Sequence, residues 1–370
     1  MHHFFSKNIY FLLRKLETRT HELNYLFWEC TSRCNLSCLH CGSDCSAERS
    51  GEDMPLADFL SALDTIESES DNLLVVLTGG EPLLRQDIEL CGREIRKRGM
   101  RWGMVSNGYL YDRQKHISLL NSGLGALTIS LDGLEVTHNW LRNTRDSFSK
   151  VERAINLAAS SARLNFDVVT CVNSRNISEL QLIYDYLVSN EVKAWRLFTI
   201  APIGRAKNNK HLFLSDVQFK ELLDFICQKR KLKSIDIKFS CEGYVGQYEL
   251  KVRDSYFFCR AGINIGSILS DGSISACPNI DKSFIQGNIY EDNFYKIWQT
   301  KFHPFRNRSW TKRGQCENCS EYSCCQGNGL HTWHGDKANP LICHNEKIKN
   351  ALKFHNQGHI ISGEHRHTGK

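Results

Sequence analysis

Residues 34–41 read Cys-Asn-Leu-Ser-Cys-Leu-His-Cys, a run with the spacing Cys-x3-Cys-x2-Cys. Its three cysteines are Cys34, Cys38 and Cys41. Three thiolates are one fewer than the four that fill a structural zinc site or complete a [4Fe–4S] cluster, so a cluster held here would keep one iron open to a second molecule. A zinc site that uses Cys30 or Cys45 as its fourth ligand is the alternative that this spacing leaves open.

Apolar runs of strand length alternate with helix-length segments around this cysteine run. We predict strands at residues 25–29, 73–78, 102–106, 126–131, 164–171 and 195–200. We predict helices between them, for example at residues 57–67, 86–97, 151–160 and 177–189. Near-continuous apolar strands that alternate with helices indicate an α/β fold with a parallel sheet covered by helices. The periodicity leaves open whether the sheet is open or curled into a barrel.

Glycine-rich and polar loops follow the second, third and fourth predicted strands. They are Gly79-Gly80-Glu81-Pro82, Ser106-Asn107-Gly108 and Ser130-Leu131-Asp132-Gly133. Because loops at the carboxyl ends of parallel strands meet at one edge, these residues are expected to share a site with the cysteine run. Glycine lets backbone carbonyl groups approach a ligand closely, and Ser, Asn and Asp side chains can bind hydroxyl groups. For each loop alone, a capped helix or a surface ion pair is the alternative.

The cysteine run and the ordered loops together resemble the radical S-adenosylmethionine (SAM) enzymes over about residues 23–345. The resemblance implies a partial (β/α)6 TIM-like barrel and a SAM-binding [4Fe–4S] cluster on the three cysteines. It also implies that the Gly-Gly-Glu-Pro loop receives the amino group of SAM and that Arg142 binds its carboxylate, which suits a guanidinium group. The other expected SAM contacts are Gly79, Gly80, Glu81, Pro82, Ser106, Asn107, Ser130 and Asp132. In this family, reductive cleavage of SAM forms a 5′-deoxyadenosyl radical that abstracts hydrogen from the substrate.

Cysteines also dominate the chain from residue 259 to residue 343, where Asp271-Gly272 predicts a two-residue type I′ hairpin turn. This part is similar to the SPASM extension of radical SAM enzymes, which usually carries two auxiliary [4Fe–4S] clusters. By position, one auxiliary cluster has a complete set of ligands: Cys316, Cys319, Cys325 and Cys343. A zinc ribbon on the same four thiolates is the alternative.

The second auxiliary site matches the SPASM pattern only in Cys259 and Cys277. Gly329 and Arg253 stand where two further cysteines are expected. The candidates to replace them are Cys241, Cys324 and His331. A reduced site, or no second cluster, is the other outcome. Sulfatase-maturating relatives carry an aspartate directly after the cysteine that matches Cys277, whereas Pro278 follows here, so the resemblance assigns no general base.

We divide the chain into a helical segment (1–22), a radical SAM core (23–205), a helical connection (206–258), a SPASM-like domain (259–350) and a polar tail (351–370). The first segment predicts an amphipathic helix that packs on the enzyme body, with Arg14 and Lys15 on its polar side; a position on a membrane surface is the alternative. The tail is expected to fray from about residue 355. A metal role for its histidines is left open: His359, His365 and His367.

The amino-acid composition of the chain limits the classes of protein to which it is expected to belong. The chain has 370 residues, of which 41 % are hydrophobic and 24 % charged, and no apolar run approaches the roughly 20 residues of a membrane span. Its net charge of +6 is dispersed, which does not indicate a nucleic-acid partner. Sixteen cysteines without an export signal favour metal or cluster binding in a reducing cytoplasm over disulfides. Three cysteines are expected to be small buried residues: Cys91, Cys171 and Cys227.

The expected function is that of a cytoplasmic radical SAM enzyme that modifies a peptide or protein and receives electrons from a flavodoxin- or ferredoxin-type partner. The peptide substrate rests on analogy with SPASM-containing enzymes. Two alternatives stand beside it. One is a radical SAM enzyme that acts on a small-molecule cofactor precursor, and the other is a non-catalytic scaffold that binds zinc or a cluster.

Overall fold

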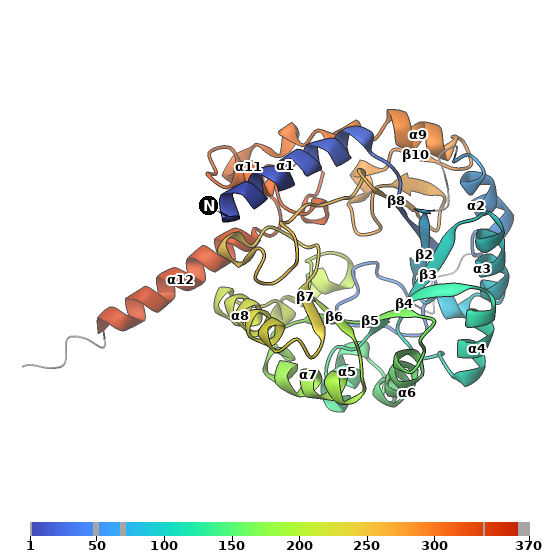
Figure 1. Cartoon of the computed structure of the whole chain (residues 1–370), viewed down its shortest axis with the longest axis horizontal. Helices are drawn as coiled ribbons and strands as arrows, with labels where there is room; N and C mark the ends of the chain where they lie inside the picture. The colour runs from blue at the N-terminus through green and yellow to red at the C-terminus, as the bar shows by residue number, and fades with distance from the viewer. Residues whose placement is uncertain (1, 47–51, 67–71, 336, 362–370) are drawn as a thin grey trace, which may run out of the picture.

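Figure 1 shows a curved sheet with helices on its outer side, in a computed structural model that describes residues 2–46, 52–66, 72–335 and 337–361. The core strands are β1 (Tyr25–Thr31), β2 (Leu74–Gly79), β3 (Arg101–Ser106), β4 (Leu124–Ser130), β5 (Asn165–Val172) and β6 (Ala194–Thr199). Each pairs in parallel with its neighbour in sequence, as predicted. The helices around them are α2 (Leu56–Leu63), α3 (Ile88–Lys97), α4 (Arg113–Asn121), α5 (Glu135–Arg142), α6 (Ser147–Ala159), α7 (Leu180–Ser189) and α8 (Asp216–Leu232). This arrangement is the predicted partial TIM-like barrel.

Four further strands widen the sheet at both of its ends. β7 (Asp236–Phe239) pairs with β6, and β8 (Ile265–Ile268) pairs in parallel with β1. β9 (Ser273–Ser275) and β10 (Gly287–Asn288) continue from β8 as antiparallel strands. The 10-stranded sheet therefore has the order β10-β9-β8-β1-β2-β3-β4-β5-β6-β7. The C-terminal hairpin belongs to the core sheet, which the sequence analysis did not predict.

The turn between β8 and β9 differs from the predicted two-residue type I′ turn. Leu269 N donates to Ser273 O at 2.9 Å and Gly272 N donates to Leu269 O at 3.0 Å, which closes a loop over residues 270–272. Gly272 has a φ of +83°, but Asp271 does not have a positive φ. A type I′ turn requires positive φ at both central residues, so the prediction was wrong. The loop is a type I turn followed by a left-handed glycine.

The two faces of the curved sheet differ in exposure. The helix-facing residues of β1 are buried: Leu26, Trp28 and Cys30. The residues between them, on the concave face, are half-buried: Tyr25, Phe27 and Glu29. The same alternation recurs in β4 and β6. A closed (β/α)8 barrel fills its interior with layers of side chains. In this partial barrel the concave face of the sheet, which we call the hollow, stays half-exposed.

The first helix, α1 (His2–Thr20), lies along the C-terminal part of the chain (Figure 1). It packs on the body as expected, but the placement of Arg14 on its polar side was wrong. The buried Arg14 guanidinium donates to Ser323 O at 2.9 Å and Cys324 O at 3.0 Å, and these bonds compensate for its burial. Lys15 is exposed as predicted, and four apolar residues of α1 are also at least half exposed: Ile9, Leu12, Leu13 and Leu16. Within the described ranges, no helix has the length and apolar character that a bilayer span requires.

The remaining helices are α9 (Phe294–Thr300), α10 (His303–Arg306), α11 (Tyr322–Cys325) and α12 (His344–Ile361). α12 continues to residue 361, so the expected fraying from residue 355 was wrong for that stretch. Of the predicted tail ligands, the side chain of His359 and all of His365 and His367 lie outside the described residues. As predicted, Cys91 is buried; Cys171 and Cys227 are only half-buried.

Candidate active site

The cysteine run forms the loop after β1, at the carboxyl edge of the sheet. Cys34 and Cys38 are buried, Cys41 is half-buried, and the three are close enough to interact electrostatically. Burial raises the pKa of Cys34 to about 11. Asn107 Nδ2 lies 3.9 Å from Cys34 Sγ, and Arg142 Nη1 lies 3.7 Å from Cys38 Sγ. The structure therefore brings the three predicted cluster ligands together with two predicted SAM contacts, and the donors favour the thiolate form that binds iron.

The two glycines after β2 lie directly against the cysteine loop. Gly80 N donates to Thr31 O at 2.8 Å, and the next residue, Glu81, donates from N to Arg33 O at 2.9 Å. Gly79 has a φ of +118°. A Cβ on Gly80 would overlap Arg33 O. We predicted that these glycines let the backbone approach a ligand; the described contact is with the loop that carries the cysteines.

Glu81 is buried and joins the loops after β2 and β3. Its carboxylate accepts hydrogen bonds from Ser106 Oγ at 2.8 Å, Asn107 N at 2.8 Å and Leu83 N at 3.2 Å. Burial raises the pKa of Glu81, although these donors oppose the shift. Pro82 begins the short 3-10 helix η2 (Pro82–Leu84). In this structure the Ser106 hydroxyl therefore donates its hydrogen bond to Glu81. The contacts of these loops with SAM stay predictions.

Asp132 and Arg142 form a buried ion pair beside Cys38. Arg142 Nη2 lies 2.6 Å from Asp132 Oδ2, and Cys171 N donates to Asp132 Oδ1 at 2.8 Å. Burial acts to raise the pKa of Asp132, but the charges of Arg142 and His40 outweigh it and lower the pKa. Removal of either partner would leave an uncompensated buried charge. The other predicted contact on this strand, Ser130, ends β4 and is half-buried.

Buried polar atoms without a hydrogen-bond partner in the described structure surround the thiols: Asn35 Nδ2, His40 Nδ1 and Arg142 Nε. Unpaired buried donors are costly, and an anionic group would satisfy the two that are donors, Asn35 Nδ2 and Arg142 Nε. Cluster sulfide and a ligand carboxylate are such groups, so the residues present fit a three-thiolate cluster with an anionic ligand. When bound, the cluster supplies the electron that cleaves SAM. The chain's own residues hold the thiols, orient the Asp132–Arg142 pair and exclude water.

A clamp on the cysteine loop was missed by the sequence analysis. The 3-10 helix η4 (Gly204–Asn208) follows β6 and carries Arg205, whose guanidinium donates to Cys38 O at 2.8 Å and Cys45 O at 2.7 Å. Its backbone N donates to Cys41 O at 2.9 Å. The signal was present in the sequence, because Gly204-Arg205 follows the sixth strand at the same carboxyl edge as the other loops.

We expect Arg205→Ala to destabilise the folded protein by about 2–3 kcal/mol, because it removes two charge-assisted hydrogen bonds to loop carbonyls. The iron content and the visible absorbance of the anaerobically purified protein should fall with it. Chemical denaturation and an iron assay measure the two effects. Lys207→Ala, an exposed cation on the same turn, is the matched control and should change neither. Wild-type iron content and stability in Arg205→Ala would contradict the clamp.

His138 holds the backbone of Asp132 in place. Its Nδ1 accepts a hydrogen bond from Asp132 N at 3.1 Å, and its Nε2 lies 3.1 Å from Ser147 Oγ. The ring is fully buried, and burial lowers the pKa of His138 from 6.5 to about 3. The native structure therefore requires the neutral ring.

Stability should decrease as pH falls below 6.5, because between pH 6.5 and about 3 His138 binds a proton only in the unfolded state. The expected loss from this group is roughly 1.4 kcal/mol per pH unit, and it is absent above pH 6.5. Denaturant unfolding at pH 7.5, 6.0 and 5.0 should show a shallower pH slope for His138→Gln than for wild type. His303→Gln, at an exposed position, should keep the wild-type slope. Equal slopes for His138→Gln and wild type would refute this assignment.

The four cysteines predicted for the complete auxiliary cluster line one cavity of about 540 Å³: Cys316, Cys319, Cys325 and Cys343. Burial, with smaller effects of Cys343 and Cys319, raises the pKa of Cys316 to about 11. Thiolates around zinc converge to about 2.3 Å from one ion. In the described parts of the chain, no group of three or more His, Cys, Asp or Glu side chains is arranged to hold a single ion. The four thiols share one cavity, and their assignment to a cluster stays a prediction.

Of the two cysteines predicted for the second auxiliary site, Cys259 is buried and Cys277 is half-buried, and they interact electrostatically with each other. Burial raises the pKa of Cys277 to about 12, and the charges of Cys241 and Cys259 contribute. Cys324, a proposed substitute ligand, lies instead beside Tyr244 and Arg14.

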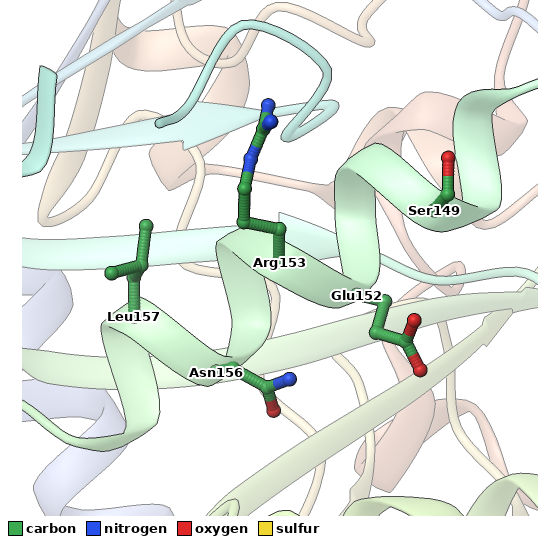
Figure 2. Close-up of a pocket in the computed structure, with 5 residues that line it drawn as sticks. All are labelled: Ser149, Glu152, Arg153, Asn156 and Leu157. Carbon is green, nitrogen blue, oxygen red and sulfur yellow. The ribbon is translucent and has the colours of Figure 1, made fainter. Parts of the chain in front are cut away.

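A separate hollow lies on the outer surface of α6, as Figure 2 shows. It is lined by residues of that one helix: Ser149, Glu152, Arg153, Asn156 and Leu157. None of these is a predicted site residue, and no second element contributes chemistry to the hollow. We therefore place the active site at the carboxyl edge of the sheet.

Two family models match parts of this chain. Residues 28–187 match the family model of the radical SAM superfamily, and residues 259–320 match that of SPASM, an iron–sulfur cluster-binding domain. An AdoMet-dependent heme synthase of Oleidesulfovibrio alaskensis is 25 % identical, over 85 % of this chain and 84 % of its own. The mycofactocin maturase MftC of Mycolicibacterium smegmatis is 26 % identical, over 82 % of this chain and 76 % of its own.

Solved structures show the same fold at lower identity. The structure of anSMEcpe with bound AdoMet and the Cp18Cys peptide has a TM-score of 0.69 and 21 % identity, and covers 92 % of this chain and 98 % of its own. Streptococcus suis SuiB bound to the precursor peptide SuiA has a TM-score of 0.65 and 15 % identity, with coverage of 84 % and 74 %. The chain therefore carries a radical SAM domain at residues 28–187 and a SPASM domain at residues 259–320, and it is a radical SAM enzyme whose cofactors are SAM and [4Fe–4S] clusters.

Proposed function

We propose that this enzyme cleaves SAM reductively at a cluster on Cys34, Cys38 and Cys41 and uses the 5′-deoxyadenosyl radical to modify a peptide or protein. The observation that supports the proposal is the half-exposed concave face of the sheet, whose strands end at the edge where the cysteine loop lies. A substrate in the hollow would reach the SAM site from the interior, shielded from bulk water. We also propose a cytoplasmic location and a flavodoxin- or ferredoxin-type electron donor.

Three hydrogen-bonded polar side chains on the concave face suit the binding of a peptide: Thr128, Asp167 and Arg196. Asp167 Oδ1 accepts from Thr128 Oγ1 at 2.6 Å, and Arg196 donates from Nε to Asp167 and from Nη2 to Thr128 Oγ1 at 3.1 Å. The side chain of Arg196 is nonetheless 42 % exposed. Burial acts to lower the pKa of Arg196, but the charge of Asp167 outweighs it and raises the pKa. A guanidinium fixed in this way can bind the carbonyl or carboxylate oxygens of a peptide.

The names of the relatives support two substrate classes. MftC is named a maturase, which supports a peptide. Four relatives are named AdoMet-dependent heme synthase or Fe-coproporphyrin III synthase, which supports an iron tetrapyrrole as the second candidate. Arg196 would suit the carboxylates of a tetrapyrrole as well. The named synthases and maturases give no support to a non-catalytic scaffold.

Anaerobic assays with dithionite distinguish the two substrates. One arm supplies synthetic peptides encoded by the small open reading frames next to the enzyme's own gene, and the other supplies iron-coproporphyrin III. We expect a peptide to stimulate 5′-deoxyadenosine formation and to change in mass. Turnover of the tetrapyrrole alone would replace the proposal with the second candidate. Absence of 5′-deoxyadenosine in both arms would overturn both.

Arg196→Met should raise the KM for the accepted substrate by about tenfold or more, since it removes a charged hydrogen-bond donor from the hollow. Steady-state kinetics of product formation, followed by mass spectrometry, measure this change. Arg153→Met, on the outer surface of α6 (Figure 2), is the matched control and should keep the wild-type KM. An unchanged KM in Arg196→Met would show that the substrate does not contact this part of the hollow.

A further inference from the structure

We propose that the protein surface around the cysteine loop is the docking site of an acidic one-electron carrier protein, which delivers the electron that SAM cleavage requires. We call this surface the donor face. It carries four exposed cations from loops at the carboxyl edge of the sheet: Arg145, Arg175, Lys207 and Lys210. The inference rests on the proposed function, since it needs a cluster on the thiols of the loop and a protein as the electron source.

Two of the loops that carry these cations are bonded to the cysteine loop. Asn209, at the start of the 3-10 helix η5 (Lys210–Leu212), donates from Nδ2 to Leu39 O at 2.9 Å. Leu39 N in turn donates to Leu141 O at 2.9 Å, at the end of α5. Asn143, just after α5, donates from Nδ2 to Ser37 Oγ at 2.9 Å. The segments after β4 and after β6 therefore both lie against the cysteine loop.

The segment after β5 completes this surface. The guanidinium of Arg175 lies 4.1 Å from the centroid of the Trp140 ring in α5, a contact that orients the cation. The neighbouring Ser174 donates from N to Leu212 O at 3.0 Å and from Oγ to His211 O at 2.6 Å. The segment after β5 thus contacts the segments after β4 and after β6, and the cations lie on one continuous surface.

The charge of the donor face is almost entirely positive. The face is built from four segments: residues 35–46, 139–145, 173–176 and 204–213. Their sequence contains a single carboxylate, Asp44, which already pairs with Arg205 at 3.2 Å. The next carboxylate along the chain, Asp146, accepts from Tyr109 Oη at 2.9 Å and lies 4.0 Å from Lys150. Among the described residues, no carboxylate forms an ion pair with the four exposed cations, so the donor face attracts an acidic partner.

The cysteine loop reaches the protein surface beside these cations. Cys41 is half-buried and Gly42 is exposed. Arg205 N donates to Cys41 O at 2.9 Å, and Lys207 lies on the same turn, η4. A protein docked on the donor face would therefore lie directly against the backbone of a predicted cluster ligand.

The predicted auxiliary cluster is the other place where electrons could enter, and its surroundings carry both signs of charge. Its cavity is lined by two glutamates and two lysines: Glu321, Glu346, Lys349 and Lys353. A surface of mixed charge attracts an acidic protein less than a surface of one sign. The charge distribution therefore favours docking at the donor face.

The test measures binding of the anaerobically purified full chain to the flavodoxins and ferredoxins encoded in the same genome. We expect at least one of these carriers to bind, and Lys207→Glu combined with Lys210→Glu to raise its Kd by about tenfold or more, because repulsion replaces attraction at both positions. An increase in salt from about 50 to about 300 mM should weaken wild-type binding, since salt screens exposed charges. Biolayer interferometry measures the Kd. Lys349→Glu combined with Lys353→Glu is the matched control at the auxiliary cavity and should keep the wild-type Kd.

Dithionite separates docking from catalysis, because a small reductant needs no docking surface. The variant with Lys207→Glu and Lys210→Glu should form 5′-deoxyadenosine at the wild-type rate with dithionite. With the carrier protein as reductant, its kcat/KM for the carrier should fall by about tenfold or more. Melting curves establish that each variant is folded. If the double charge reversal unfolds the protein, Lys207→Gln combined with Lys210→Gln takes its place and should raise the Kd by about threefold or more.

An unchanged Kd in the donor-face variant would overturn the proposal, as would the absence of any carrier that binds the wild type. Weaker binding in Lys349→Glu combined with Lys353→Glu alone would place the docking site at the auxiliary cavity instead. Equal weakening in both variants would show that the carrier responds only to net charge, which also contradicts a specific donor face. A wild type that binds the carrier but forms no 5′-deoxyadenosine with dithionite would contradict the proposed function and leave the binding result unaffected.

Discussion

Alanine in place of Cys38 is expected to lower 5′-deoxyadenosine formation by more than about a thousandfold, because the cluster carries chemistry that no side chain can replace. The iron content should fall by about four per chain. Cys38 is a predicted ligand that two arginines contact: Arg142 donates to its sulfur and Arg205 to its carbonyl oxygen. Anaerobic turnover with dithionite, followed by chromatography of the nucleoside product, measures the effect.

Cys45→Ala is the matched control for this experiment. Cys45 is a buried cysteine of the same loop, and its carbonyl oxygen also accepts a hydrogen bond from Arg205. As it is not a predicted ligand, the variant should keep its iron and at least half of the wild-type activity. Equal losses in Cys38→Ala and Cys45→Ala would mean that the assay reports the folding of the loop rather than ligation. That result would contradict the three-thiolate assignment.

Gly80→Ala is expected to destabilise the protein by roughly 3 kcal/mol and to release the SAM-site cluster, because the new methyl group would overlap Arg33 O. Arg33 and Cys34 are adjacent, so relief of this overlap displaces the backbone of a cluster ligand. SAM cleavage should fall with the iron content. Denaturant unfolding, the iron assay and 5′-deoxyadenosine formation measure the three effects.

Gly42→Ala, in the cysteine loop that Gly80 contacts, provides the comparison. A Cβ at Gly42 would meet Ile203 side-chain atoms at 3.4 Å and 3.5 Å, which is ordinary van der Waals contact. This variant should therefore fold and bind iron like the wild type. If Gly80→Ala behaved like Gly42→Ala, the close approach of the two loops would not matter for ligation.

The parts of the fold that the sequence predicted are those with a strong local pattern. β1 to β6 are near-continuous apolar runs between helices, and the sequence located each of them within a few residues. β7 is four residues long, which is too short to stand out from the surrounding loop. The pairing of β8 with β1 joins segments far apart in sequence, and no local pattern reports it. The left-handed turn at Gly272 depends on loop length, which is set by the strand register.

In the candidate site, too, the residues with a distinctive sequence pattern were predicted and those without one were missed. The loops with Gly80 and Asp132 were found because their residue types and order are distinctive, and the structure places them beside the cysteines. Arg205 was missed because a single arginine after a strand has no distinctive pattern, although its position at the carboxyl edge was informative. Arg14 was misplaced because an arginine on an amphipathic helix is usually solvated; here buried carbonyl oxygens satisfy it.

The pairing of β1 with β8 has a consequence for how the protein is made. β1 ends at residue 31, whereas β8 begins at residue 265, so one edge of β1 has no partner while the ribosome completes the chain. At 5–20 residues per second, this interval lasts roughly 10–50 s. An unpaired strand edge is a site for aggregation, and here it directly precedes the cysteine loop. The N-terminal half of the chain therefore passes through an interval in synthesis when it is most exposed to aggregation.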